Sequence, residues 1–219
     1  MKNDWAITAG GIGFAVLTLL GLYLLMPGVA GGDTTNAESV EWVRQSGHQV
    51  RGIAGAYLMC LGAMAMIAFV AGVLGRLRAA GAEPFMLEVA RLAGLAFVVC
   101  QIVAAIAMAS AVYAVSAGNE PTPIDPGAAR ITTFGLALWL IPGMISGALF
   151  ACVVGVSMLR TRAFPAWVGL AALLTAAVLL AAVTFLPAII LLVWSGCVGV
   201  VAAVRHQPIP RLEPQPAPP

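Results

Sequence analysis

Long apolar stretches separated by short polar segments make up most of this chain. A helix needs about 20 apolar residues to cross a hydrocarbon core of ~30 Å. The gaps between charged residues therefore predict membrane spans at about residues 5–26, 52–75, 92–115 and 132–158. Residues 166–204 also carry no charge, and one helix of that length would measure about 58 Å. We therefore expect the chain to fold back near residues 184–187, with spans at 166–183 and 187–204.

These spans predict an all-α fold, a polytopic transmembrane bundle of six helices within residues 1–206. The first stretch follows a short basic start and precedes small residues, a pattern that a cleaved signal peptide also shows. Its apolar run is longer than the ~7–15 residues of a typical signal core, so we interpret it as a membrane anchor. The segment 207–219 is rich in proline and is predicted to be a disordered tail.

The one substantial polar segment before the second span predicts an amphipathic helix at about residues 36–51. Thr35 and Glu38 fit a capping box, in which both side chains bond free backbone amides at a helix start. The helix would continue into the second span as one long helix, with Gly47 as the candidate break. Its polar stripe consists of Glu41, Arg44, His48 and Arg51. This stripe is either a contact site for an anionic ligand, lipid headgroup or partner protein, or a solvated face with internal ion pairs.

The distribution of basic residues predicts the orientation. With six spans, one side carries Lys2, Arg76, Arg78, Arg91, Arg160, Arg162, Arg205 and Arg211, and the other carries Arg44, Arg51 and Arg130. Short cytoplasmic loops carry an excess of Lys and Arg. The sequence therefore predicts six spans with both termini in the cytoplasm, and it places the amphipathic helix outside.

Small residues recur every fourth position in the stretch 142–155. Gly143, Gly147, Ala151 and Gly155 would form one smooth stripe on a helix, and Ser195, Gly199 and Ala203 repeat the spacing in the last span. Such stripes let helix backbones approach closely in lipid. They indicate either a dimer seam or packing within one bundle. We expect the helix at 132–158 to lie at the centre of the bundle and to be kinked at Pro142.

The composition of the chain and the polar residues within its spans limit the classes of function that it can have. The chain of 219 residues is 61% hydrophobic and 9% charged, whereas soluble domains carry about 25% charged residues. Its net charge of +2 predicts no nucleic-acid partner. Within the spans, Gln101 and Ser146 either join helices by hydrogen bonds or line a polar ligand cavity.

The remaining reactive residues form no recognised motif. The cysteines Cys60, Cys100, Cys152 and Cys197 lie in apolar stretches without a Cys-x-x-Cys pair, which indicates apolar packing rather than a disulfide framework or a zinc site. The chain has two histidines, and they do not form a His-Glu-x-x-His motif. We therefore predict no catalytic residues, no metal and no cofactor.

With the spans placed, the chain resembles a bacterial six-span integral membrane family of unknown function, of the domain-of-unknown-function type. The resemblance rests on the polar outer loop, on Leu74-Gly-Arg-Leu-Arg78, and on Leu159-Arg-Thr-Arg-Ala-Phe-Pro-Ala-Trp-Val-Gly169. It covers about residues 39–206. It implies the fold and a location in the bacterial cytoplasmic membrane, and it transfers no functional residue. Trp167 in the second segment is equally typical of an interfacial aromatic anchor.

These observations favour a non-enzymatic multi-pass membrane protein that acts as a scaffold or as an accessory subunit of a membrane complex. Its partners would be the lipid bilayer and either another membrane protein or further copies of itself. The alternative is a binding or transport protein for a lipid or small amphiphile. It would use an intramembrane cavity around Gln101, Ser146 and the kink at Pro142.

Overall fold

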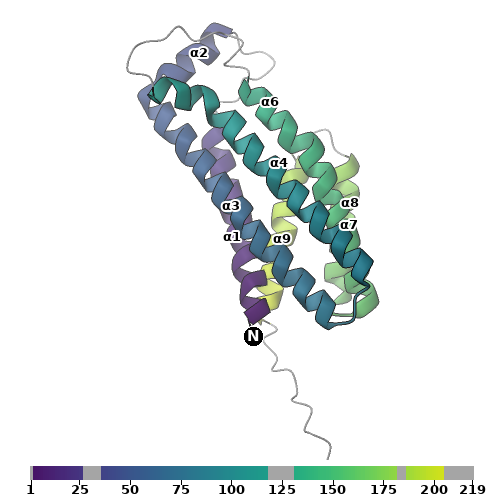
Figure 1. Ribbon diagram of the computed structural model, residues 1–219. Coiled ribbons are helices and arrows are strands. Elements are labelled where there is room, and N and C mark those ends of the chain that lie inside the picture. Colours follow the sequence, from purple (N-terminus) through teal and green to yellow (C-terminus); the bar gives the residue numbers. More distant parts are fainter. Residues whose placement is uncertain (1, 27–35, 118–130, 182–185, 205–219) are drawn as a thin grey trace, which may run out of the picture.

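The chain forms an elongated bundle of helices that lie side by side (Figure 1). The computed structural model describes residues 2–26, 36–117, 131–181 and 186–204. These residues are 95% helical and contain no strand, as the sequence predicts. The elements are α1 (Lys2–Leu25), α2 (Asn36–Arg44), α3 (Ser46–Ala79), α4 (Pro84–Ala117), α6 (Ile131–Leu138), η2 (Trp139–Gly143), α7 (Met144–Thr161), α8 (Ala166–Ala181) and α9 (Leu186–Val204).

Four helical segments of the described chain are long and apolar enough to cross a membrane. They are Asp4–Leu25, Ser46–Ala79, Pro84–Ala117 and Ile131–Thr161. Two shorter apolar helices, α8 and α9, follow them. α3 and α4 have 34 residues each and are about 51 Å long, longer than the predicted spans at 52–75 and 92–115. Each helix continues past the charged residues that we used to mark the span ends.

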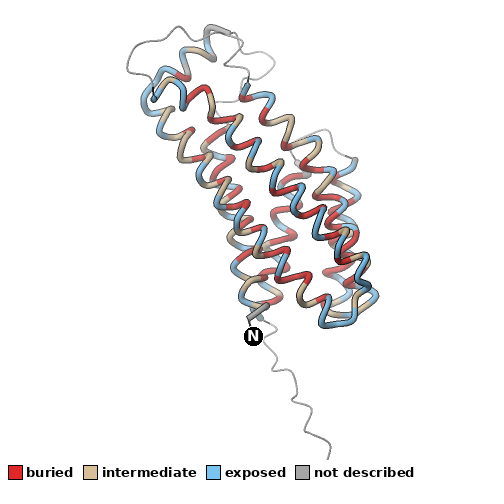
Figure 2. The backbone as a smooth tube through the Cα atoms, viewed as in Figure 1, coloured by how far each residue is buried: buried red, intermediate tan, exposed pale blue. Residues whose placement is uncertain are grey.

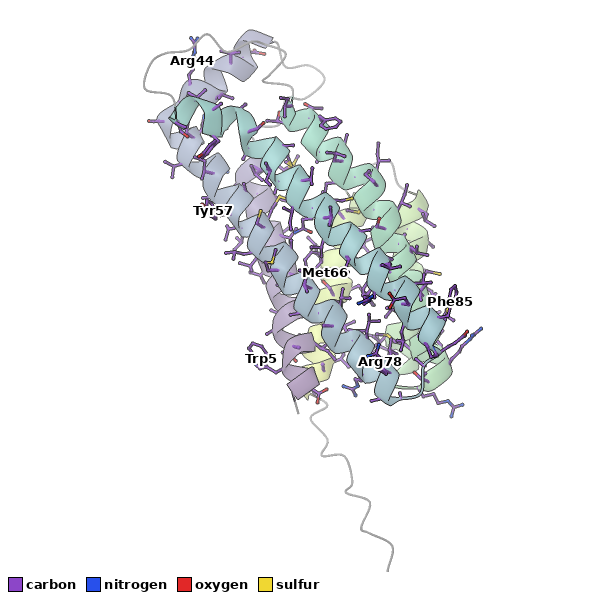
Figure 3. The ribbon with its side chains drawn as sticks, viewed as in Figure 1. Trp5, Arg44, Tyr57, Met66, Arg78 and Phe85 are labelled. Atoms are coloured by element: carbon purple, nitrogen blue, oxygen red, sulfur yellow. The ribbon has the colours of Figure 1, made fainter. Side chains whose placement is uncertain are left out.

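The two ends of the bundle are distinct. α1, α4 and α8 begin at the end that holds the N-terminus, and α3, α7 and α9 end there (Figure 1). We call this end the amino end. Arg78 and Trp5 lie there, whereas Arg44 lies at the opposite end (Figure 3). The predicted tail at 207–219 lies outside the described residues, as do residues 184 and 185 of the predicted turn, whereas Leu186 and Pro187 begin α9.

The segment 131–161 is one continuous helical run with a wider turn inside it. Trp139–Gly143 forms a π-helix that contains Pro142. Proline has no N–H and its ring clashes with the preceding turn of an α-helix, and a π-turn is one of the local adjustments that accommodate this residue. Ser146 Oγ donates a hydrogen bond of 2.8 Å to the carbonyl of Pro142. Where the sequence predicts a kink at Pro142, the structure thus has a widened turn, and the carbonyl of Pro142 accepts a hydrogen bond from Ser146.

The amphipathic segment and the long helix that follows it are separate helices, α2 and α3. The chain is extended at Gln45, with φ −70° and ψ 120°, two residues before the break that we placed at Gly47. Gln49 Nε2 donates to the carbonyls of Val43 and Arg44, at 3.2 and 3.3 Å. This side chain therefore satisfies carbonyls that the end of α2 leaves free. Val43 is buried against Val112 of α4 and fixes α2 on the bundle.

Aromatic rings fill the interior between the long helices. Phe14 of α1 meets Phe97 of α4 edge-on, with ring centroids 5.8 Å apart. Phe69 of α3 meets Trp194 of α9 at 5.9 Å, and Phe150 of α7 lies 6.4 Å from both rings. The buried residues follow the inward side of every long helix (Figure 2). These rings join helices that are distant in sequence.

The main helix contacts form a ring, in the order α1, α3, α4, the segment 131–161, α8 and α9, with α9 packed against α1. In this ring α4 contacts α3 on one side and α6, η2 and α7 on the other, and Figure 1 shows it between α3 and α6. The helix at 132–158, which we expected at the centre, packs mainly against α4 and α8. The expectation was wrong because a small-residue stripe shows where a backbone can approach closely and does not show how many neighbours the helix has.

Candidate functional site

Gln101 is the centre of a buried polar contact among three helices. Its Nε2 donates to Thr18 Oγ1 of α1 and to the carbonyl of Met59 of α3, both at 3.0 Å. Gln101 and Thr18 are fully buried. Gly62 leaves the necessary room, since a Cβ there would lie 2.5 Å from Thr18 Oγ1. We call this set the Gln101 junction, and its contacts are those of a residue that joins helices.

The second predicted polar residue does not share this contact. The hydroxyl of Ser146 bonds the carbonyl of Pro142 in its own helix. Neither Gln101 nor Ser146 lines the apolar groove along α9, the pocket beside the α3–α4 turn or the pocket between α3 and α4. Gln101 Oε1 is buried and lacks a hydrogen-bond partner among the described residues. The geometry therefore does not assemble Gln101, Ser146 and Pro142 into one ligand site.

Arg76 makes a second polar contact among distant segments, which we did not anticipate. Its Nη1 forms an ion pair with Asp4 Oδ1 of α1 at 3.2 Å, and its Nε donates to the carbonyl of Ala163 at 3.2 Å. The guanidinium also lies over the ring of Phe164, with Cζ 4.6 Å from the centroid. This Arg76 junction ties α1, the end of α3 and the α7–α8 turn together at the amino end. A lone Asp in the first turn of a span was the available sequence signal.

The predicted stripe Glu41, Arg44, His48 and Arg51 is divided between two helices. Glu41 and Arg44 are exposed on α2, and His48 and Arg51 lie on α3 beyond the break at Gln45. Arg51 turns toward α1, where its Nη2 donates to the carbonyl of Tyr23 at 3.3 Å and its Cζ lies 5.3 Å from the Tyr23 ring centroid. Of these four residues, only Glu41 and Arg44 remain together on the exposed surface of one helix.

The stripe that begins at the end of η2 and continues along α7 faces neighbours inside the bundle. A Cβ on Gly143 would lie 3.5 Å from Cys100 of α4, and one on Gly147 would lie 3.3 Å from Phe97 of α4 and from Leu191 of α9. A Cβ on Gly155 would lie only 2.9 Å from the carbonyl oxygen of Gly169 in α8. Ala151 is fully buried. In this structure the stripe serves packing within one chain.

The shorter stripe in α9 lies partly against α1. A Cβ on Gly199 would lie 3.1 Å from the carbonyl oxygen of Thr8, and Ser195 is fully buried with its hydroxyl bonded to the carbonyl of Leu192 at 2.9 Å. Ala203 is exposed. The stripe therefore does not continue as one buried face to the end of the helix.

The most extensive helix contact, between α1 and α3, was not found from the sequence. A Cβ on Gly10 would lie 2.5 Å from the backbone nitrogen of Phe69, and one on Gly21 would lie 2.8 Å from the carbonyl oxygen of Gly55. Gly55 and Gly62 are seven residues apart, and Gly10 and Gly21 are eleven apart. Both spacings return close to the same helix face, so a search at these periods would have found this seam.

Reactive side chains do not gather elsewhere in the part of the chain that the structure describes. No group of three or more His, Cys, Asp or Glu side chains is placed to hold a metal ion there. Cys152 and Cys197 are exposed, and Cys60 and Cys100 are half-buried. Comparison of the chain with family models, curated proteins and solved structures found no match.

Proposed function

We propose that this chain is a non-enzymatic accessory or scaffold subunit of a membrane complex, and that the exposed face of α2 contacts its partner. The observation that carries the proposal is the placement of α2. Val43 holds this short helix on the ends of α3 and α4, while Glu41 and Arg44 remain exposed to solvent. A separate charged helix held on a rigid bundle is a suitable recognition surface, since exposed opposite charges give specificity more than affinity.

The polar contacts inside the bundle support the same proposal. The Gln101 and Arg76 junctions use their polar groups to connect helices. The hydroxyls of Ser157 and Thr175 donate to carbonyls four residues earlier in their own helices, both at 2.8 Å. These groups stabilise the arrangement of the bundle, as expected for a protein that presents a surface.

The test is co-purification from native membranes. A tagged chain at its natural expression level is extracted in gentle detergent and weighed by native mass spectrometry. We expect a stoichiometric complex with a second protein or a second copy of the chain. The charge reversals Glu41→Lys and Arg44→Glu together should remove that partner, because they invert the pattern on the α2 face.

Arg78→Glu supplies the matched control, since Arg78 is exposed at the amino end, far from α2. This variant should keep the partner. A wild-type chain that is recovered only as a monomer would refute the accessory-subunit proposal. A complex that survives both α2 reversals would refute the role of α2.

We further propose that α8 and α9 complete six spans, with both termini in the cytoplasm. α8 has 16 residues and α9 has 19, so they are about 24 and 28 Å long, close to the core of ~30 Å. Of the described residues, the amino end carries Arg76, Arg78, Arg91, Arg160 and Arg162, and the opposite end carries Arg44 and Arg51. This asymmetry follows the positive-inside rule.

Reporter fusions test this topology. A fluorescent protein joined after residue 219 should be bright, and alkaline phosphatase at that site should be inactive, because the phosphatase folds only outside the cytoplasm. Alkaline phosphatase inserted within 118–130 should be active. The reverse pattern at residue 219 would refute a cytoplasmic C-terminus. The resemblance stated above supports the bacterial cytoplasmic membrane as the location.

A further inference from the structure

A polar pocket lies at the amino end, between the α3–α4 turn and the last turns of α7. It has a volume of about 350 Å³, within the ~300–1,000 Å³ that small-molecule sites occupy. Its described lining comes from the turn 80–83, from Met86 in the first turn of α4, and from Ser157, Arg160 and Thr161 of α7. A Cβ on Gly81 in the turn would meet no atom within 4 Å, so this side of the pocket is open.

Two opposite charges line the pocket without pairing with each other. Glu83 and Arg160 are both exposed, and neither side chain forms an ion pair or a hydrogen bond with another described residue. Elsewhere at this end opposite charges do pair, since Arg91 donates to Glu88 at 2.6 Å. The pocket therefore keeps one carboxylate and one guanidinium available to a ligand.

The hydroxyl groups of the pocket offer acceptors. Ser157 is buried and donates its proton to the carbonyl of Val153 at 2.8 Å. Thr161 donates to the carbonyl of Ser157, also at 2.8 Å. Because each hydroxyl has one proton, what remains for a ligand is acceptor capacity. Together with the Glu83 carboxylate, these oxygens favour a ligand that carries an ammonium group, while Arg160 favours an anion.

The pocket lies at the level where we expect the membrane surface. Phe85, beside the pocket lining, is 70% exposed and lies at the amino end (Figure 3). Trp167 in the first turn of α8 is also exposed at this end. Aromatic side chains favour the membrane interface. The headgroup of a lipid can therefore reach the pocket while its acyl chains stay beside Phe85, and a soluble ligand can enter from the water.

We propose that this pocket binds a small zwitterion, in which a short linker joins a phosphate or carboxylate to a primary ammonium. The anion lies at Arg160, and the ammonium donates hydrogen bonds to the carboxylate of Glu83. The headgroup of phosphatidylethanolamine has this chemistry, and so has a free zwitterion of similar size. The pocket and α2 lie at opposite ends of the bundle, so this proposal and the partner surface on α2 can fail separately.

The test adds lipid to the delipidated full-length chain and counts bound molecules by native mass spectrometry. Three lipids with the same acyl chains are compared. Phosphatidylethanolamine has both charges, the ammonium of phosphatidylcholine has no N–H, and phosphatidylglycerol has no ammonium. The wild-type chain should bind one phosphatidylethanolamine about fivefold more tightly than either other lipid, the upper value for an exposed ion pair.

Four variants with matched controls locate the two charges. Glu83→Gln should remove the preference for phosphatidylethanolamine over phosphatidylglycerol, and Glu88→Gln, which lies outside the pocket lining, should keep it. Arg160→Gln should weaken the binding of both lipids about fivefold, and Arg162→Gln should leave both unchanged, since Arg162 does not line the pocket. All four side chains are exposed, so the variants should fold as the wild type does.

Water-soluble glycerophosphoethanolamine identifies the source of the ligand. Displacement of phosphatidylethanolamine by an equal concentration would support a free zwitterion as the ligand, and displacement only by a large excess would support the lipid. Equal binding of the three lipids, together with no binding of glycerophosphoethanolamine, would overturn the proposal. A Glu83→Gln chain that keeps the wild-type preference would overturn it as well.

Discussion

Replacing Gly10 by alanine should force α1 away from α3. The added Cβ would lie 2.5 Å from the nitrogen of Phe69, 2.8 Å from the oxygen of Ala65 and 2.9 Å from the Cα of Phe69. All three are backbone atoms of α3, so no side chain can rotate to relieve the contact. The two helices must separate, and their interdigitated side chains lose van der Waals contact along the seam.

The expected loss in the free energy of unfolding for Gly10→Ala follows from two opposing effects. Overpacking a close contact costs about 1–3 kcal/mol, and a clash with backbone falls in the upper part of that range. Alanine in place of glycine in a helix interior recovers about 1 kcal/mol. The net loss for Gly10→Ala is therefore about 1–2 kcal/mol.

Gly196→Ala is the matched control in a mid-membrane helix. Its Cβ would meet Ala15 Cβ at 3.6 Å, an ordinary contact, so the change should stabilise the chain by up to about 1 kcal/mol. The two variants should thus differ by about 1–3 kcal/mol, or roughly 2–12 °C in Tm for a chain of this length. Thermal unfolding in one detergent provides the measurement. A Gly10→Ala chain as stable as Gly196→Ala would refute the close approach of α1 and α3.

Three further changes test the polar contacts and the attachment of α2. Gln101→Leu should lower the free energy of unfolding by about 1 kcal/mol, since it removes two hydrogen bonds and such bonds between membrane helices average about 0.6 kcal/mol. A double-mutant cycle with Thr18→Val should return a coupling energy of about 0.6 kcal/mol. A coupling energy of zero would contradict the hydrogen bond between Gln101 and Thr18. Asp4→Asn should lower the free energy of unfolding by less than about 1 kcal/mol. Arg76→Ala should lower it by about 2 kcal/mol, because this variant also loses a hydrogen bond and a cation–π contact. Equal losses for the two variants in denaturation would contradict the wider Arg76 junction. Val43→Ala should remove about 1 kcal/mol of the packing free energy that holds α2 on the bundle. Amide hydrogen exchange in α2 should then be about fivefold faster. Unchanged exchange would show that Val43 does not hold α2.

The break at Gln45 shows the limit of local prediction. Apolar and polar positions on either side continue in one helical phase, so periodicity favoured one helix through 36–51 and into the second span. In the structure the backbone is extended at Gln45, and Gln49 bonds the free carbonyls of Val43 and Arg44. Buried Val43 then packs against α4. A tertiary contact stabilises the break at a residue with no local signal for it.

By itself the sequence determined that the chain is all-helical and apolar enough for a membrane, because span length and the exclusion of charge are local properties. It also located close-approach positions such as Gly147 and Gly155. Only the tertiary structure decided which neighbours they meet, because in lipid an apolar face has no preference among apolar neighbours. The pairing of Gly10 with Phe69, of Gln101 with Thr18 and of Arg76 with Asp4 joins residues far apart in the chain. These contacts follow from how the helices fit together in three dimensions, which spacing along one helix does not encode.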